Sequence, residues 1–149
     1  MSLEAQVMDR MKEAMKAKDK VALESLRAIK SAILLEKTSG AGGEITSQGE
    51  IKLLQRLVKQ RKDAAAIYAE QNRTDLADAE LAQVAVIEQF LPEQMSPEAL
   101  EEEISKIIAQ LGASSSSDMG RVMGVASKSL AGKAEGKAIA DMVKKLLAR

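Results

Sequence analysis

The stretch Leu91-Pro92-Glu93-Gln94-Met95-Ser96-Pro97 holds both prolines of the sequence and divides it into two parts. A proline cannot donate the backbone hydrogen bond that a helix interior requires, and it disfavours helix at the residue before it. Pro92 therefore predicts the end of a helix. Ser96 followed by Pro97 predicts the start of the next one, because serine caps free amide groups and proline suits the first helical position. We predict two domains, residues 1–94 and residues 95–149.

Upstream of this stretch, apolar residues recur at the spacing of amphipathic helices and predict four of them. The breaks fall at Lys18-Asp19-Lys20, at the glycine-rich segment from Thr38 to Gly43, and at Asn72 to Asp75, where Thr74 or Asp75 can cap the fourth helix. The predicted apolar faces are Leu3, Val7, Met11 and Met15; Leu23, Leu26, Ile29, Ile33 and Leu34; Leu54, Leu57, Val58, Ala64, Ala65 and Tyr68, in a helix from about Gln48 to Gln71; and Leu76, Leu81, Val84, Ile87 and Leu91.

Downstream, the same periodicity predicts three helices, with a stop at Gly112 and a glycine turn from Gly132 to Gly136. Ser114 to Ser117 form a polar linker, and Ser117 or Asp118 can cap the helix that follows. The predicted faces are Leu100, Ile104, Ile107, Ile108 and Leu111; Met119, Val122, Met123 and Ala126; and Ile139, Met142, Val143 and Leu146. Tyr68 and Phe90 are the only aromatic residues, whereas sheets usually recruit many. We therefore predict an all-α fold, with about four helices followed by three.

The side-chain inventory excludes several chemistries. Without histidine or cysteine the sequence cannot form a serine–histidine or cysteine–histidine nucleophile, a His/Cys zinc site or a disulfide. Carboxylates such as Glu101, Glu102 and Glu103 remain, but acids in the first turn of a helix are favoured by its dipole. We expect no metal, no cofactor and no catalytic site. A carboxylate enzyme stays open as the weaker alternative.

The charges balance, since 22 basic and 22 acidic residues give a net charge of zero. Overall electrostatics therefore give no reason to expect binding to DNA or to a membrane. The sequence has no signal peptide at its start and no run of about 20 apolar residues that would span a bilayer. We expect a cytoplasmic protein.

Local basic patches nevertheless exist. Lys52, Arg56 and Lys59 share one face of the third predicted helix, near Arg61 and Lys62. From Ala113 onward the sequence has seven basic residues and three acidic ones, an excess of four positive charges that could contact phosphates. A solvated surface is the alternative interpretation. No aromatic residue follows Met95, so any RNA contact would be to the backbone and not to stacked nucleobases.

Gly120 and Gly124 lie on one face of the sixth predicted helix. Each costs about 1 kcal/mol relative to alanine inside a helix, so a compensating contact is expected. We favour close packing of a neighbouring backbone and keep the approach of RNA or of a partner helix as the alternative. The eight methionines could line a protein-binding groove, although most methionines at helical spacing, such as Met11 and Met15, fill cores.

Four motifs resemble the YqeY family. Lys59 to Asp63 with Tyr68 and Asn72 to Leu76 resembles its central helix, and Glu88 to Ser96 resembles its "YLPxQLS" junction, with Phe90 in the aromatic place. Asp118 to Met123 is similar to its "DMGKVM" segment, and Ala134 to Lys137 to its "ADGK" turn, where Glu135 replaces the commoner aspartate. The serine linker also departs from the family pattern.

The resemblance implies a helical N-terminal domain, a C-terminal three-helix domain, and kinship with the tail of the GatB subunit of the tRNA-dependent amidotransferase. That tail contacts tRNA, and the glutamine-dependent carbon–nitrogen ligase chemistry belongs to other parts of the enzyme. We therefore expect a module that binds tRNA, an amidotransferase or another tRNA-handling protein, without chemistry of its own. A protein–protein adaptor with no RNA contact is the alternative. The expected phosphate contacts are Lys59, Arg61, Lys62, Arg121, Lys133 and Lys137.

Overall fold

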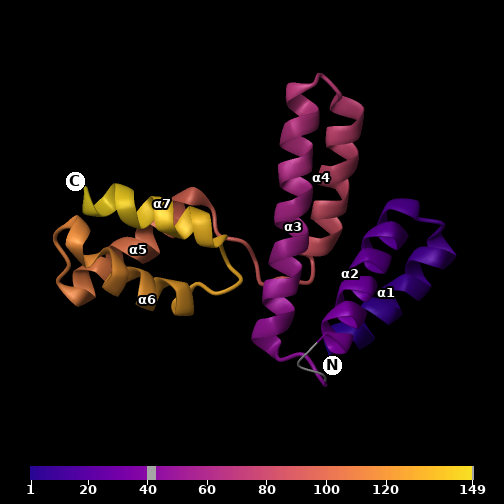
Figure 1. The fold of residues 1–149 in the computed structure, drawn as a ribbon, viewed down its shortest axis with the longest axis horizontal. Coiled ribbons are helices and arrows are strands. Elements are labelled where there is room, and N and C mark those ends of the chain that lie inside the picture. Colours follow the sequence, from indigo (N-terminus) through magenta and orange to yellow (C-terminus); the bar gives the residue numbers. More distant parts are fainter. Residues whose placement is uncertain (40–42, 149) are drawn as a thin grey trace. The chain divides into compact units, whose positions relative to one another are not determined.

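The computed structural model describes residues 1–39 and 43–148, and every regular element in them is a helix (Figure 1). This confirms the all-α class with four helices followed by three. Within the predicted loop from Thr38 to Gly43, residues 40–42 lie outside the described residues, as does Arg149 at the end of the last basic segment. The helices are α1 (Leu3–Ala17), α2 (Lys20–Thr38), α3 (Ser47–Glu70), α4 (Thr74–Glu88), α5 (Pro97–Leu111), the 3₁₀ turn η1 (Ser116–Asp118), α6 (Met119–Ser129) and α7 (Gly136–Leu147).

The chain forms two compact units, Met1–Leu91 (the N unit) and Pro92–Arg149 (the C unit). They divide three residues before the predicted boundary at 94/95. Two hydrogen bonds join the segment after Pro92 to the turn between α6 and α7. The side-chain amide of Gln94 donates to the carbonyl of Gly132 at 2.6 Å, and the N–H of Met95 donates to the carbonyl of Lys133 at 2.9 Å. The segment after Pro92 is therefore tied to the C unit.

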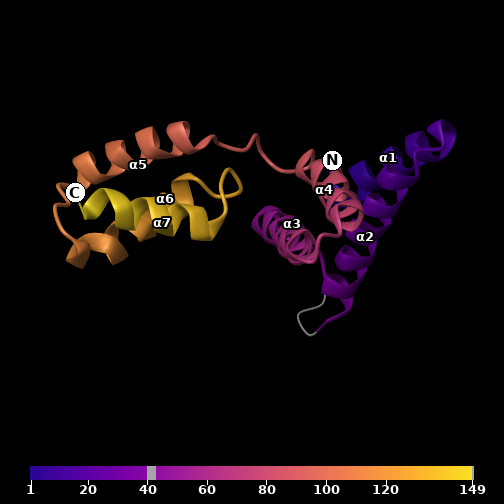
Figure 2. The same ribbon diagram turned by 90° about the horizontal axis from the view of Figure 1, so that it is seen from above.

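The N unit consists of two helical hairpins. Figures 1 and 2 both show α1 alongside α2 and α3 alongside α4. Their facing sides bury an aliphatic core whose fully enclosed side chains include Val7, Leu26, Ile29, Leu53, Leu54 and Ile87. Phe90, just after α4, lies under the Arg10 guanidinium, whose carbon is 5.4 Å from the ring centre. This contact fixes the end of α4 against α1.

Three residues that we expected on buried faces are exposed: Met15 at 54%, Leu34 at 62% and Leu81 at 47%. Ala14 and Ser25 are buried instead. The hydroxyl of Ser25 donates to the carbonyl of Val21 at 2.8 Å, so this polar group is satisfied without leaving its own helix. On α1 and α2 the small residues Ala14 and Ser25 take the buried positions, whereas Met15, Leu34 and, on α4, Leu81 lie at the surface.

Side-chain caps begin most of the long helices. The side chains of Ser2, Asp19, Thr46 and Ser96 each accept a backbone N–H in the first turn of the helix that follows. The predicted cap of α4 by Thr74 or Asp75 is wrong, because the helix begins at Thr74 and Arg73 occupies the cap position without a capping bond. The preceding Asn72 has a positive φ of 59°, which turns the chain tightly enough to place Arg73 there.

The C unit packs α5, α6 and α7 around a separate core that includes Ile104, Val122 and Val143. Gly112 ends α5 in the left-handed conformation at φ 64°, which glycine adopts readily at a helix C-terminus. The chain reverses between α6 and α7, so the end of α6 and the start of α7 lie at the same end of the unit (Figure 1). Among the described helices, none is long and apolar enough to cross a membrane.

Candidate nucleic-acid interface

The exposed side of α6 combines glycine with basic residues. Gly120, Gly124 and Lys128 recur every four residues, and Arg121 lies beside them; all four are exposed. Val122 and Ala126 occupy the opposite side and are fully buried in the C unit core. Because residues four apart share a helix face, the four exposed residues form one strip along α6. We name Gly120, Arg121, Gly124 and Lys128 the α6 strip.

Nothing in the described structure packs against the two glycines. A Cβ added at Gly120 or at Gly124 would meet no atom within 4 Å. Our expectation that a neighbouring backbone packs closely there is therefore wrong for the described chain. The alternative that we kept open, approach by RNA or a partner helix, remains. The α6 strip exposes bare helix backbone at a cost of about 1 kcal/mol for each glycine.

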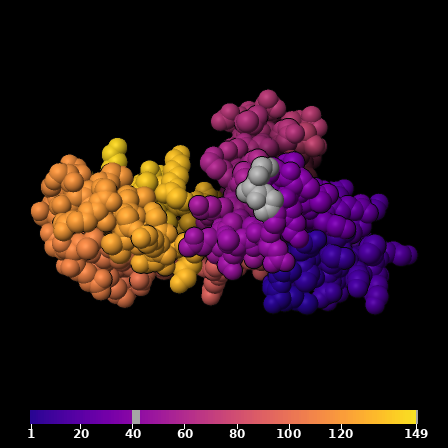
Figure 3. Space-filling model, turned by 60° about the horizontal axis from the view of Figure 1, so that its bottom comes forward, coloured from indigo at the N-terminus to yellow at the C-terminus, as the bar shows by residue number. Residues whose placement is uncertain are grey.

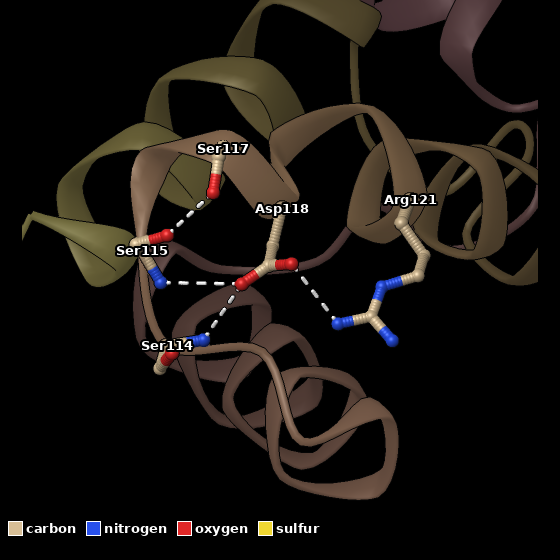
Figure 4. A network of polar contacts seen from close by, with 5 residues as sticks. All are labelled: Ser114, Ser115, Ser117, Asp118 and Arg121. Atoms are coloured by element: carbon tan, nitrogen blue, oxygen red, sulfur yellow. Dashed lines mark hydrogen bonds and ion pairs between the residues drawn. The ribbon is translucent and has the colours of Figure 1, made fainter.

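Asp118 organises the loop that leads into α6 (Figure 4). One carboxylate oxygen accepts the N–H groups of Ser114 at 2.9 Å and Ser115 at 3.3 Å. The other accepts a bond from Nη2 of Arg121 at 3.1 Å. The serine linker is therefore ordered by its own acid. Asp118 stands at the cap position of α6 as one of the two expected residues, but its side chain bonds backwards to the linker and makes no capping bond.

These contacts have two consequences. The hydrogen bonds from the Ser114 and Ser115 backbone, followed by the bond from Arg121, hold the pKa of the Asp118 carboxyl below its usual value of 3.8. Asp118 therefore stays ionised at neutral pH. It also restrains the half-exposed Arg121 side chain, at 52% exposure, beside the α6 strip. A restrained cation loses less conformational entropy when it binds an anion.

A second group of cations lies at the start of α7. Lys133 and Lys137 are exposed on either side of Gly136, the first residue of the helix, and an added Cβ at Gly136 would meet nothing within 4 Å. Glu135, at the cap position, makes no side-chain capping bond. The first amide groups of a helix have no acceptor within it and carry the positive end of its dipole. This end of α7 therefore favours anions, as phosphates at helix N-termini illustrate.

One turn of the chain connects the cations of α6 to the cations at the start of α7. Lys128 lies in the last turn of α6, and the turn from Leu130 to Glu135 connects it to Lys133 and Lys137. Arg121 lies seven residues before Lys128, about 10 Å along the helix axis. Lys128 was absent from the expected contacts, although its seven-residue distance from Arg121 in the sequence places both on the same face.

Acids moderate the charge around Lys133. This lysine lines an open cleft of about 610 Å³ together with Glu93 and Glu103. Leu130 forms part of the same wall. The two carboxylates reduce the positive potential inside the cleft.

The three expected contacts on α3 differ from one another. Lys59 pairs with Asp63 at 2.8 Å. Arg61 is half-buried and donates to Oε1 of Gln83 on α4 at 2.9 Å and to the carbonyl of Leu57 at 3.1 Å. Lys62 is exposed. The Arg61 guanidinium therefore links α3 to α4, and the structure does not gather the three residues into one phosphate-contacting group.

The described residues contain no cluster of three or more acids placed to hold a metal ion.

Comparison with known proteins gives a family. The sequence profile described as "Yqey-like protein" matches residues 4–147.

Two curated proteins are similar to the chain. "Altered inheritance of mitochondria protein 41, mitochondrial" of Lachancea thermotolerans is 29% identical over 101 residues, which cover 68% of this chain and 53% of that protein. An uncharacterized protein of Schizosaccharomyces pombe is 28% identical over 96 residues, which cover 64% of this chain and 76% of that protein. The chain matches about half the length of the first of these relatives. Neither name states a ligand or a reaction.

Proposed function

The chain belongs to the YqeY-like family, and from that premise we propose that it is an RNA-binding module whose C unit contacts the sugar–phosphate backbone of tRNA. The resemblance of its motifs to the GatB tail supports tRNA as the ligand. The module carries no catalytic site of its own and presents tRNA to the enzyme that performs glutamine-dependent amidation, or to another tRNA-handling protein. A cytoplasmic location stays a prediction, because one relative is named as mitochondrial.

The observation that carries this proposal is the α6 strip. Two uncovered glycines give a smooth helix surface, and Arg121 and Lys128 lie along it, separated by about two helical turns. Bare backbone admits close approach of a bulky polymer, and cations at both ends neutralise successive phosphates. The described C unit offers no aromatic side chain for stacking nucleobases, so recognition depends on backbone shape and charge.

The primary contacts are Arg121 and Lys128, with Lys137 and Lys133 extending the surface to the start of α7. Lys62 and Lys59 are secondary candidates because they lie in the N unit, whereas the α6 strip belongs to the C unit. Arg61 is a structural residue in this account, since its guanidinium is occupied by α3 and α4.

Filter binding with total tRNA at low salt tests the proposal. The full chain is compared with Arg121→Ala/Lys128→Ala and with Lys12→Ala/Lys16→Ala, a control that removes two exposed lysines from α1. We expect the first pair to weaken binding at least tenfold and the control pair to change it less than twofold. Absence of binding by the unaltered chain, or equal losses in both double variants, would refute the proposal.

A further inference from the structure

The α1–α2 hairpin carries an uncovered apolar surface. Met8 is 44% exposed, Met15 is 54% exposed and Leu34 is 62% exposed. Met11 and Leu23 lie half-buried against the N unit core. We name Met8, Met11, Met15, Leu23 and Leu34 the methionine face.

The five residues belong to two adjoining stripes. On α1, Glu4, Met8, Met11 and Met15 follow one another at spacings of four, three and four residues, which places them on one side of the helix. On α2, Leu23, Lys30, Leu34 and Lys37 recur at spacings of seven, four and three residues. The carboxylate of Glu4 accepts a hydrogen bond from Nζ of Lys37, so the start of one stripe touches the end of the other.

Because the helices are antiparallel, the two stripes then run side by side. In the space-filling view the indigo surface of α1 adjoins the violet surface of α2 (Figure 3). We call the boundary between the two stripes the seam.

Basic residues surround this seam. Lys12 and Lys16 are exposed beside the α1 stripe, Arg27 is exposed beside the α2 stripe, and Lys30 is an exposed member of the α2 stripe itself. The acids nearby are Glu4, which is bonded to Lys37, the exposed Asp9, and Glu44 and Glu50, which line a pocket with Glu4 and Lys37 at one end of the seam. Along the rest of the seam, four exposed basic residues stand against one exposed acid, in a chain of zero net charge.

Other exposed apolar residues of the N unit, such as Leu35 and Ile67, lie outside both stripes. Single exposed apolar side chains are normal on protein surfaces. A group of them on one face, bordered mainly by charges of one sign, is typical of an interaction site.

We infer that the methionine face docks an acidic amphipathic helix of a partner protein. A third helix fits the seam between two antiparallel helices and presents apolar side chains at i, i+3 or i+4, and i+7. Methionine side chains adapt to such anchors because they are unbranched and polarizable. Acidic residues on both sides of the partner's stripe meet the lysines and arginine along the seam. This surface belongs to the N unit, so the inference is independent of RNA binding by the C unit.

The methionines themselves provide the assay. The chain has eight: Met1, Met8, Met11 and Met15 in the N unit, and Met95, Met119, Met123 and Met142 in the C unit. With ¹³C-labelled methionine methyl groups, each is a separate NMR reporter in the full-length protein. The probe is a synthetic 18-residue helical peptide with leucine at positions 4, 8, 11 and 15 and glutamate elsewhere on its flanks. A second peptide has lysine in place of every glutamate.

We expect the acidic peptide to shift the methyl signals of Met8, Met11 and Met15 and to leave those of Met119, Met123 and Met142 unchanged. Leu34→Ser weakens its affinity about tenfold, because a leucine anchor contact is lost. The adjacent Leu35→Ser, a matched change on the other side of α2, leaves the affinity within twofold. The lysine peptide binds at least tenfold more weakly than the acidic one.

Failure of the acidic peptide to shift the three signals at millimolar concentration overturns the inference. So does equal binding of the two peptides, or equal loss in Leu34→Ser and Leu35→Ser. Vesicles of phosphatidylserine and of phosphatidylcholine form a separate arm. If the phosphatidylserine vesicles alone broaden the three signals and the acidic peptide does not, an anionic lipid surface replaces the partner helix. Sedimentation velocity is the last measurement. If the unaltered chain is a dimer and Leu34→Asp is a monomer, the methionine face binds a second copy of the chain and the inference is overturned.

Discussion

Gly124 lies in the middle of α6, where glycine is the least favourable residue apart from proline, yet nothing in the described structure packs against it. Natural helices rarely keep such a residue without a reason, and here the reason proposed is contact with RNA. If Gly124 destabilises the free protein but helps it to bind RNA, replacing it should raise the free energy of unfolding and lower the affinity for tRNA.

We predict that Gly124→Ala raises the free energy of unfolding by about 1 kcal/mol, because alanine restricts the unfolded chain and the site has room for a methyl group. The same change lowers tRNA affinity severalfold by holding the sugar–phosphate backbone away. Urea unfolding and filter binding measure the two effects. Ser105→Ala on the exposed side of α5 is the control, since it also favours helix but lies outside the α6 strip. Tighter tRNA binding by Gly124→Ala would contradict the assigned role.

Asp118 gives a pH-dependent prediction. Its folded-state pKa is below its usual value of 3.8, so its contribution to stability is fully present above that pH and is lost as the pH falls through the folded pKa. We expect Asp118→Asn to lower the melting temperature at pH 7. The difference in melting temperature between Asp118→Asn and the unaltered protein becomes progressively smaller below pH 3.8. A gap that stays constant between pH 7 and pH 2.5 would show that the carboxylate bonds to Ser114 and Ser115 contribute nothing.

At the scale of elements, α3 and α4 show which basic residues support the fold. Arg61 links these helices through Gln83 and the Leu57 carbonyl, whereas Lys62 is exposed one residue later. Arg61→Ala is expected to lower the free energy of unfolding by about 1 kcal/mol, since two hydrogen bonds are lost. Its tRNA affinity stays within twofold of the unaltered chain. Lys52→Ala, at another exposed position of α3, serves as the control for stability in urea unfolding. If Arg61→Ala weakened tRNA binding tenfold without loss of stability, Arg61 would be a direct contact.

The ends of elements were the most predictable part of the fold, because local chemistry decides them. Ser96 caps α5 with Pro97 at its first position, and Gly112 ends the same helix, as their residue types require. The start of α4 was mispredicted because the positive φ of Asn72 moved the cap position to Arg73. Periodicity placed Leu34 and Met15 on buried faces, but it cannot show which of several adjoining positions a neighbouring helix covers, and here Ala14 and Ser25 are buried instead.

The candidate site was predictable in part. Gly120 and Gly124 followed from sequence spacing, and Arg121 followed from the positive excess after Ala113 and from the family resemblance. The openness of the glycines depends on what packs nearby, which only tertiary structure shows. The bonding of Arg61 to α4 also could not be read from the sequence, because Gln83 is 22 residues away.

At the scale of the whole molecule, the two units have separate cores, one including Leu26 and Leu54 and the other including Ile104 and Val143. We predict that Ile104→Ala, at a fully buried position, destabilises the C unit by about 2–5 kcal/mol. Hydrogen exchange is expected to speed up throughout α5, α6 and α7 and to stay unchanged in α2 and α3. Equal acceleration in both units would show that they unfold together.

The central claim, that the C unit binds tRNA through backbone phosphates, is tested most directly by the salt dependence of tRNA affinity. The logarithm of the association constant is measured against the logarithm of salt concentration for the full chain and for Arg121→Ala/Lys128→Ala. The account predicts a steep negative slope that becomes shallower by about 2 in the double variant, one for each phosphate contact removed. A slope near zero for the full chain, or one unchanged by the two substitutions, would contradict it.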